Sequence, residues 1–408
     1  MAGAPLKPVD EALAHVHAAL KPVTAESINL AQAFGRVLAE DVRARVTQPP
    51  ADVSAMDGYA VIAADVATVP ATLRVIGEAP AGGSFPGTLK PGEAVRIFTG
   101  GPVPAGADAI VIQEDVERSG DSIAVREDSA AGRHIRRKGL DFKAGDTVLK
   151  AGHRLTARDI GLCAAMNVPW LQVRRRPRIA LLATGDEVVR PGEPIGPNQI
   201  VSSNSFALAA LIESRGGVAT DLGIAPDSRD ALAAMAEGAR GADMLVTMGG
   251  ASVGDRDLVQ SVLGEKGLQT EFWRIAMRPG KPLIFGNING TPMLGLPGNP
   301  VSSMICGLLF LGTALHRFLG AEGDALQTET ATLGRELPLN DTRRDYMRAT
   351  LERRGGVLVA TPFATQDSSQ LSGLSRAHCL VIREPHEPAA RAGEPCTILR
   401  IDGGGQTL

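Results

Sequence analysis

Apolar and polar residues alternate in a regular way between residues 178 and 320. Short apolar runs that fit buried strands are each followed by a segment whose apolar residues have helical spacing. The predicted strands are 179–183, 218–224 and 243–247, and the predicted helices are 204–212, 227–239, 257–266 and a long apolar helix ending at residue 319. This alternation predicts a parallel sheet with helices on both faces, which binds ligands at the carboxyl ends of its strands.

The amino-terminal part of the chain has a different pattern. An amphipathic helix is predicted from four apolar residues at helical spacing, Val9, Leu13, Val16 and Leu20. A second helix is predicted at 156–168, and we expect it to pack on the first. Short β-rich runs separated by glycine and proline lie between them. The region between the two helices is therefore expected to be a β domain inserted between two halves of one domain.

The last segment returns to short strands with a hairpin turn at Arg354–Gly356, which predicts a small β barrel or sandwich. The predicted fold class is a multidomain α/β plus β protein. Its expected parts are a helical and extended domain at 1–43 and 145–175, a β-rich inserted domain at 44–144, an α/β domain at 176–326 and a small β barrel at 327–408.

Composition excludes several classes of partner. The 408 residues carry a formal net charge of -3 and only 3% aromatic residues, so neither a basic surface nor base-stacking platforms for nucleic acid are expected. The amino terminus has no charged segment followed by an apolar stretch, and no run reaches ~18 uninterrupted apolar residues. We expect a soluble cytoplasmic protein without a membrane partner.

The loop after the strand at 243–247 carries the first candidate chemistry. Gly249, Gly250 and Gly254 allow the backbone to approach a ligand closely, and Ser252 can donate a hydrogen bond to an anion. Two carboxylates follow, Asp255 and Asp257, which could bridge Mg²⁺ to phosphate oxygens. The alternative is a tight connection that binds nothing.

Three further loops are predicted to reach the same edge of the sheet. Asp186 and Glu187 follow the strand at 179–183, Arg278 and Lys281 lie in a proline-rich turn, and residues 295–302 precede the long apolar helix. The backbone amides of the last of these loops and Ser302 could hold another anion. The alternative is that Lys281 is an ordinary surface lysine and that the Pro-Gly turns are structural.

The two β regions contribute candidates of their own. In the inserted region these are Asp57, Thr99 and Asp141, and in the last segment they are Arg344, Arg348, Ser368 and Ser369. Together with the acidic loops, these residues suit a phosphorylated or nucleotide-bearing substrate and a second oxyanion. The sequence has no GxGxxG and no Gly-Lys-Thr loop, so the nucleotide-binding sites that depend on these motifs are excluded. The remaining chemistry is that of carboxylates which hold a hard metal and act on a phosphoanhydride.

Six motifs occur in a characteristic order: 54–60, 98–102, 184–187, 249–254, 279–282 and 296–302. With these motifs the chain resembles the molybdopterin molybdenumtransferase family, which comprises bacterial MoeA and the E domain of gephyrin, from about residue 5 to about residue 400. The resemblance implies a homodimer that dimerises through its first domain. It also implies that the α/β domain is a MogA-like three-layer domain that binds molybdopterin.

The resemblance also implies an activity, that of a molybdopterin molybdotransferase in molybdenum cofactor biosynthesis. Adenylylated molybdopterin would be hydrolysed at its phosphoanhydride with Mg²⁺, AMP would leave, and molybdate would be inserted. The molybdopterin adenylyltransferase is a further expected partner. The implied catalytic residues are Asp57, Thr99, Asp141, Glu187 and Asp257, and the implied Mg²⁺ ligands are Asp186, Glu187, Asp255 and Asp257.

Substrate binding is implied for a larger set of residues. It consists of Asp186, Gly249, Gly250, Ser252, Gly254, Asn299, Arg278, Lys281, Ser302, Arg344, Arg348, Ser368 and Ser369. Asp57, Thr99 and Asp141 would reach the crevice from the other subunit.

The chain departs from the family pattern at Met248, where such loops usually carry Ser, at Arg278, where many members have Lys, and at His378, where Asn is usual. Two other functions remain open. One is a non-catalytic dimeric scaffold like the E domain of gephyrin, and the other is a nucleotide pyrophosphatase of the competence-damage type. The second shares only the α/β domain, so the inserted and carboxyl-terminal domains favour the transferase.

Overall fold

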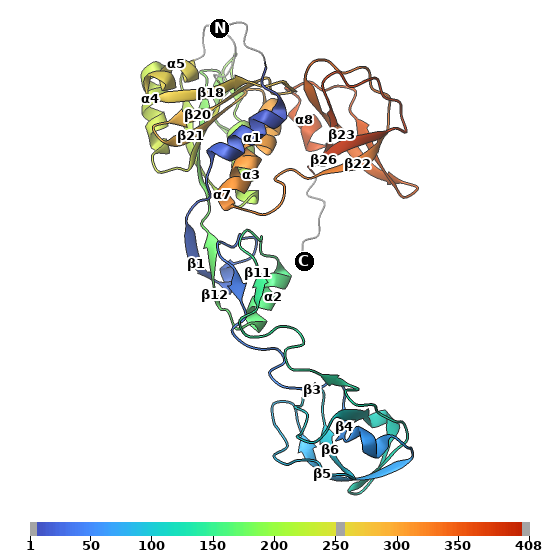
Figure 1. Cartoon of the computed structure of the whole chain (residues 1–408). Coiled ribbons are helices and arrows are strands. Elements are labelled where there is room, and N and C mark those ends of the chain that lie inside the picture. The colour runs from blue at the N-terminus through green and yellow to red at the C-terminus, as the bar shows by residue number, and fades with distance from the viewer. Residues whose placement is uncertain (1–5, 250–257, 402–408) are drawn as a thin grey trace.

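The computed structural model describes residues 6–249 and 258–401 of the chain. The molecule is elongated (Figure 1). An α/β domain and the carboxyl-terminal barrel lie side by side at one end, the β-rich inserted domain lies at the other end, and a narrow middle region joins them.

The α/β domain is built on one six-stranded sheet. Its strands, in spatial order, are β16 (Val218–Ala225), β13 (Arg178–Thr184), β17 (Met244–Met248), β21 (Thr291–Leu296), β20 (Pro282–Ile288) and β18 (Leu268–Arg274). The first four strands are parallel, while β20 and β18 run antiparallel to their neighbours. The parallel-rich sheet therefore brings the carboxyl ends of four strands to one edge.

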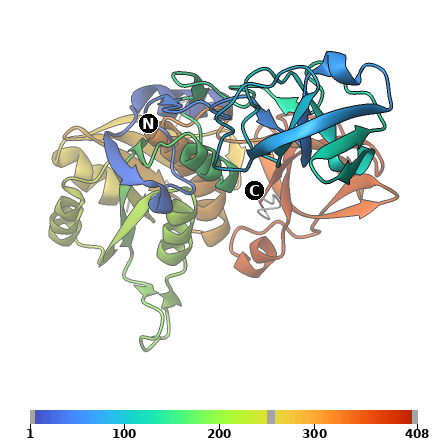
Figure 2. The same ribbon diagram turned by 90° about the horizontal axis from the view of Figure 1, so that it is seen from below.

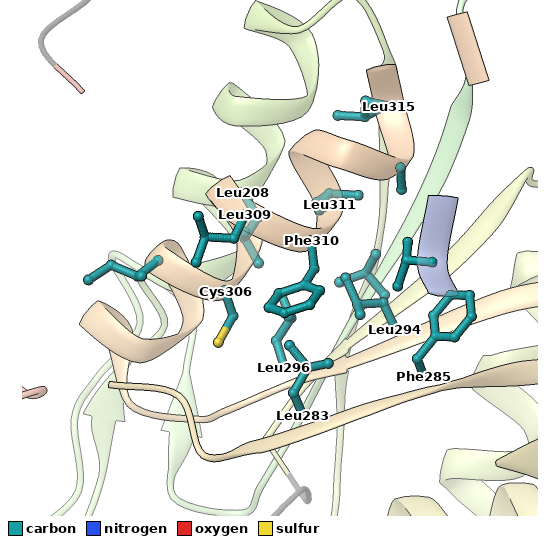
Figure 3. Close-up of a cluster of buried hydrophobic side chains, with 14 of the residues drawn as sticks. Leu208, Leu283, Phe285, Leu294, Leu296, Cys306, Leu309, Phe310, Leu311 and Leu315 are labelled. Carbon is teal, nitrogen blue, oxygen red and sulfur yellow. The ribbon is translucent and has the colours of Figure 1, made fainter. Parts of the chain in front are cut away.

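Helices cover both faces of this sheet. One face carries α1 (Val9–Ala19), α3 (Asn204–Ser214), α6 (Pro300–Cys306), the π-helical segment η5 (Gly307–Leu311) and α7 (Gly312–Leu319), and the other carries α4 (Arg229–Ala236) and α5 (Leu258–Glu265). Figure 3 shows the larger of the two cores, in which Phe310 and Leu311 from the helical layer meet Leu283, Leu294 and Leu296 from the strands. The predicted three-layer α/β arrangement is confirmed.

The segment Pro300–Leu319 is the one part of the described chain that is long and apolar enough to span a membrane. However, 78% of it is buried inside the molecule, between the sheet and helices α1 and α3. Its apolar character is explained by this position in the core.

The first helix packs differently from the prediction. Helix α1 lies against α7 of the α/β domain, and its Val9 and Val16 join the same core as Ile179. Helix α2 (Ala157–Ala165) belongs to a separate core in the middle region, with Leu38 and Leu171. Helical periodicity marks an apolar face but does not identify the surface that the face covers, so the sequence could not assign α1 to its partner.

Strands hold the middle region together. Strand β1 (Ala25–Asn29) pairs antiparallel with β12 (Trp170–Arg174), and β2 (Val42–Arg43) pairs with β11 (Thr147–Leu149). The strands that precede the inserted domain in the sequence are thus paired with the strands that follow it.

The inserted domain is a second six-stranded sheet with a short two-stranded sheet beside it. The larger sheet runs β7 (Ala109–Ile112), β4 (Gly58–Val61), β6 (Glu93–Ile97), β5 (Ala71–Ala79), β9 (Ser122–Val125) and β8 (Val116–Ser119), and the smaller pairs β3 (Val53–Ser54) with β10 (Ile135–Arg136). This confirms the predicted β-rich inserted domain.

The carboxyl-terminal domain is a closed barrel. Strands β23 (Arg344–Arg354), β24 (Val357–Pro362), β22 (Thr328–Leu333), β26 (Pro395–Arg400) and β25 (Cys379–Arg383) follow one another, and β25 pairs back onto β23 to close the ring. The two-residue strand β19 (Met277–Arg278) leaves the α/β domain to pair with the start of β23. The predicted small β barrel is confirmed, and β19 fixes it to the α/β domain.

Candidate functional site

A cavity of ≈ 770 Å³ opens at the carboxyl ends of the parallel strands, where the α/β domain meets the barrel. The loops after β13, β17 and β21 form most of its wall, and Ser369 and Leu371 reach it from the barrel side. The polar residues in its lining are Thr184, Glu187, Ser202, Ser203, Asn204, Asp227, Asn299 and Ser369. Ligand sites are expected at this position in open parallel sheets.

Close backbone packing brings three of these loops together. Gly249 has φ +92°, and a Cβ atom at that position would lie 2.9 Å from the carbonyl oxygen of Thr184. A Cβ at Gly298 would lie 3.7 Å from the Cα of Gly249. Glycine is therefore required at 249 both by its backbone conformation and by the neighbouring strand.

The acidic loop after β13 enters the same cavity. Glu187 lines it, and its carboxylate folds back over Gly185, so closely that a Cβ at Gly185 would lie 2.4 Å from Glu187 Oε2. The amide of Asp227 donates to Asp186 Oδ1 at 3.0 Å. Asp227 itself lines the cavity, although the sequence suggested only a helix cap at this position; the N-cap of α4 is Ser228.

Sequence reasoning also missed an arm, residues 186–203, that leaves and returns to this edge. It contains the paired two-residue strands β14 (Val188–Val189) and β15 (Ile200–Val201). Ile200 and Val201 line the cavity, and Asn204 just beyond them donates to the carbonyl oxygen of Gly298 at 2.8 Å. The arm was overlooked because two-residue strands show no periodicity.

Part of the predicted metal site lies outside the described residues. Asp255 and Asp257 lie outside the described residues, as do Gly250, Ser252 and Gly254. Within 6–249 and 258–401, no group of three or more His, Cys, Asp or Glu residues could hold a metal ion. The carboxylate oxygens of Glu187 and Asp227 are nevertheless donors of the type that Mg²⁺ prefers.

The loop after β21 connects the cavity to the barrel. Asn299 is the N-cap of α6, and its Nδ2 donates to Ser368 Oγ at 3.1 Å. The amide of Val301 donates to the carbonyl oxygen of Ser368 at 3.1 Å. Ser302 is buried at the start of the same helix. Two backbone segments from different domains are therefore joined beside the cavity.

The predicted cations occupy unlike environments. The Arg278 guanidinium pairs with Asp341 at 3.0 Å and with Asp345, and the hydrogen bond to Asp345 raises the pKa of Arg278. Arg344 makes two hydrogen bonds to Asp10, at 2.6 and 2.8 Å, and a third to Glu384. Both guanidinium groups thus already have carboxylate partners.

Arg348 has a different kind of partner. It is only 1% exposed and donates to backbone carbonyl oxygens, at 3.0 Å for Gln370 and 2.9 Å for Asp367. Burial lowers its pKa. Arg348 therefore holds the segment that carries Ser368 and Ser369. Lys281, by contrast, is exposed and lies next to Pro282 in the cavity wall. Its side chain has no hydrogen-bond or ion-pair partner in the described parts of the chain.

Asp57, Thr99 and Asp141 belong to the inserted domain. Its sheet, with Asp57 and Thr99, is at the opposite end of the molecule from the cavity (Figure 1), whereas Asp141 lies beside Phe142, which packs in the middle region. Asp57 Oδ1 accepts hydrogen bonds from the Thr99 amide at 2.7 Å and from Thr99 Oγ1 at 2.9 Å. These two bonds lower the pKa of Asp57. Asp141 is exposed on the same domain. Within one chain, these residues and the cavity do not come together.

The departures at Met248 and His378 are accommodated without disruption. Met248 is 3% exposed and contributes an apolar surface to the cavity wall. His378 accepts a hydrogen bond at Nδ1 from the Leu351 amide at 3.1 Å. Met248 therefore alters the cavity itself, whereas His378 acts within the barrel.

Three family models match the chain in order. They describe the MoeA N-terminal region (domain I and II) at residues 7–167, a probable molybdopterin binding domain at 180–317 and the MoeA C-terminal region (domain IV) at 330–401. Together they span all four structural parts described above.

Individual relatives agree with these models. The chain is similar to molybdopterin molybdenumtransferase 2 of Mycobacterium tuberculosis, with 36% identity over 90% of this chain and 92% of that protein. A molybdopterin molybdenumtransferase of Nostoc is 34% identical over 92% of this chain and 88% of that protein. A crystal structure of the molybdopterin biosynthesis MoeA protein of Pyrococcus horikoshii matches with a TM-score of 0.86 at 28% identity, over 97% of this chain and 100% of that one.

Proposed function

Since the chain belongs to the MoeA family of molybdopterin molybdenumtransferases, we propose that its cavity binds adenylylated molybdopterin and that AMP leaves as molybdate is inserted. Members of this family act in molybdenum cofactor biosynthesis. The observation that carries the proposal is the cavity itself, which places Glu187 and Asp227 at the carboxyl ends of parallel strands beside the Gly249 turn.

Charge in the cavity supports a role for Mg²⁺. None of the described residues that line it is a lysine, an arginine or a histidine, whereas Glu187 and Asp227 are acidic. A phosphoanhydride in this setting needs positive charge from another source, because burying it uncompensated would cost many kcal/mol. Asp186, Glu187, Asp255 and Asp257 are the residues that would hold Mg²⁺, which offsets the charge of the phosphate oxygens when it is bound.

A homodimer would complete the site. The inserted domain that carries Asp57 and Thr99 lies at the far end of the same chain from the cavity (Figure 1). In a two-fold symmetric dimer each inserted domain can approach the cavity of the other subunit. Asp57 would then face the bound substrate as a carboxylate, since its hydrogen bonds with Thr99 keep it ionised.

We assign Lys281 as the cation for molybdate. Its ammonium group is unpaired in the described structure, whereas Arg278 and Arg344 are engaged with carboxylates. Arg348, Ser368 and Ser369 would support the same anion site through the segment that Arg348 holds. The adenylylated substrate would be supplied by an adenylyltransferase, which we propose as a partner.

The test is to mix purified protein with adenylylated molybdopterin, Mg²⁺ and molybdate, and to follow AMP release with and without molybdate. Molybdate-dependent AMP release together with metal-bearing pterin is the expected result. Release that is indifferent to molybdate would favour a pyrophosphatase and contradict the proposal. Tight binding without release would favour a scaffold and would also contradict it.

A further inference from the structure

The arm beside the cavity exposes large apolar side chains. Ile195 is 59% exposed, Ile200 61% and Val201 41%. In Figure 2 the arm is the green loop that projects from the α/β domain. Single exposed apolar residues are common, but a group of them at the mouth of a ligand cavity indicates a binding surface.

Only part of the arm belongs to the cavity. Ile200 and Val201, which form β15, line it, whereas Ile195 at the tip does not. Strand β15 is held in place by its neighbour, because the Ile200 amide donates to the carbonyl oxygen of Glu187 at 2.7 Å and the Ser202 amide donates to Val189 at 2.8 Å. The backbone of β15 is therefore held next to the acidic loop.

Two further apolar residues belong to the cavity wall. Val188 and Met248 line it, and Met248 is almost fully buried. Met is a flexible residue that adapts to the face of a flat ring. The cavity lining thus combines carboxylates and glycine turns with the apolar residues of β15, Val188 and Met248.

The proposed substrate has a charged phosphoanhydride with a flat ring system on either side of it, the pterin and the adenine of the AMP moiety. We propose that β15 is the pterin-binding surface, with Ile200 and Val201 packing on the ring face while the phosphates lie at the Glu187 side. This inference rests on the proposed function and names the residues that orient its substrate. The Ile200 amide of β15 donates directly to the carbonyl oxygen of Glu187. The position of the pterin ring is therefore coupled to the position of the phosphates.

The experiment compares three variants of the full-length protein. Ile200→Ser with Val201→Ser removes the apolar surface, Ile200→Leu with Val201→Leu keeps it, and Ile195→Ser is the matched control from the same arm outside the cavity. Affinity for molybdopterin is measured by fluorescence and affinity for AMP by calorimetry. The oligomeric state of each variant is checked by sedimentation.

We expect the double serine variant to bind molybdopterin about tenfold to a hundredfold more weakly, because burying two branched apolar side chains against a ring contributes that much. Its AMP affinity should stay within about twofold of wild type, since AMP lacks the pterin. The leucine and Ile195→Ser variants should bind both ligands like wild type.

Unchanged molybdopterin affinity in the double serine variant would overturn the inference while leaving the proposed function intact. An equal loss for AMP and molybdopterin, or a change in oligomeric state, would also overturn it, because the surface would then be structural or would contact another subunit. Failure of the wild-type protein to bind either ligand would instead contradict the proposed function.

Discussion

At the scale of single residues, the state of Asp57 depends on one neighbour. Thr99 donates to it twice, through its amide and its hydroxyl, and both bonds favour the ionised carboxylate. Arg96 adds a smaller favourable charge effect. The carboxylate therefore stays ionised, and able to contact a cation, at pH values where an ordinary Asp would begin to take up a proton.

Replacing Thr99 with Val should raise the pKa of Asp57. The variant loses the hydroxyl donor but keeps the amide donor, so the pKa should stay below the ordinary value of 3.8. Because the folded-state pKa is depressed, the stability that Asp57 contributes is present above 3.8 and is lost as the pH falls through the folded-state value. In the variant the loss should be smaller and should be complete at a higher pH. A ¹³C NMR titration of the Asp57 carboxylate measures this, and coincident titration curves would contradict it.

Lys281 should matter for the anion and not for folding. Its side chain has no partner in the described structure, so Lys281→Ala should leave the unfolding midpoint unchanged. Loss of a charge-assisted contact should lower molybdate-dependent turnover about tenfold to a hundredfold. Lys266→Ala, another exposed lysine away from the cavity, is the control and should behave like wild type. Equal turnover in both variants would remove Lys281 from the site.

The contrast between Lys281 and the arginines shows which properties of single residues the sequence could predict and which it could not. Arg278 and Lys281 lie in one turn and appeared equivalent as candidate cations. Their difference arises from Asp341, in the loop before β23, and Asp345, in β23 itself, both more than 60 residues away from Arg278 in the sequence. Pairing over such distances cannot be inferred from local spacing.

At the scale of elements, the turn that carries Lys281 is set by its contact with α6. Gly280 has φ +109°, and a Cβ at this position would lie 2.3 Å from Cys306 Sγ. Cys306 is fully buried in α6, so the sulfur has little room to move. The turn therefore depends on glycine for its conformation and for its packing.

Gly280→Ala should destabilise the fold by about 2–5 kcal/mol, because backbone strain and overpacking add. Gly241→Ala is the matched control, since Gly241 has φ +82° but no neighbour within 4 Å of its Cβ position. It should show the strain alone. Cys306→Ala should partly rescue Gly280→Ala in urea unfolding. Equal destabilisation by the two alanine substitutions would show that the sulfur contact contributes nothing.

Three strands of the α/β domain, β13, β16 and β17, were predicted with ends close to those observed, whereas β18, β20 and β21 were not predicted. Residues 179–183 correspond to Arg178–Thr184, and 218–224 correspond to Val218–Ala225. Strong periodicity and long apolar runs allowed these segments to be predicted from the sequence. The arm at 186–203 was not predicted, since its strands are held by the β13 loop and not by a pattern of their own.

At the scale of the whole molecule, the residues proposed for one catalytic site lie in distant parts of a single chain. The cavity lies between the α/β domain and the barrel, while Asp57 lies in the inserted domain at the other end of Figure 1. The sequence predicted the inserted domain and the barrel from their short strands. It could not place them relative to one another, because few apolar residues connect the inserted domain to the rest and pattern carries no information on distance.

The central claim is that two subunits build one catalytic site, and mixed dimers test it most directly. Inactive Asp57→Asn and Glu187→Gln proteins are unfolded together, refolded and assayed for molybdate-dependent AMP release. If each site combines one subunit's cavity with the other's inserted domain, half of the dimers are mixed and each has one intact site. About a quarter of wild-type activity should then return. No recovery, despite mixed dimers being present, would show that Asp57 and Glu187 do not act across subunits.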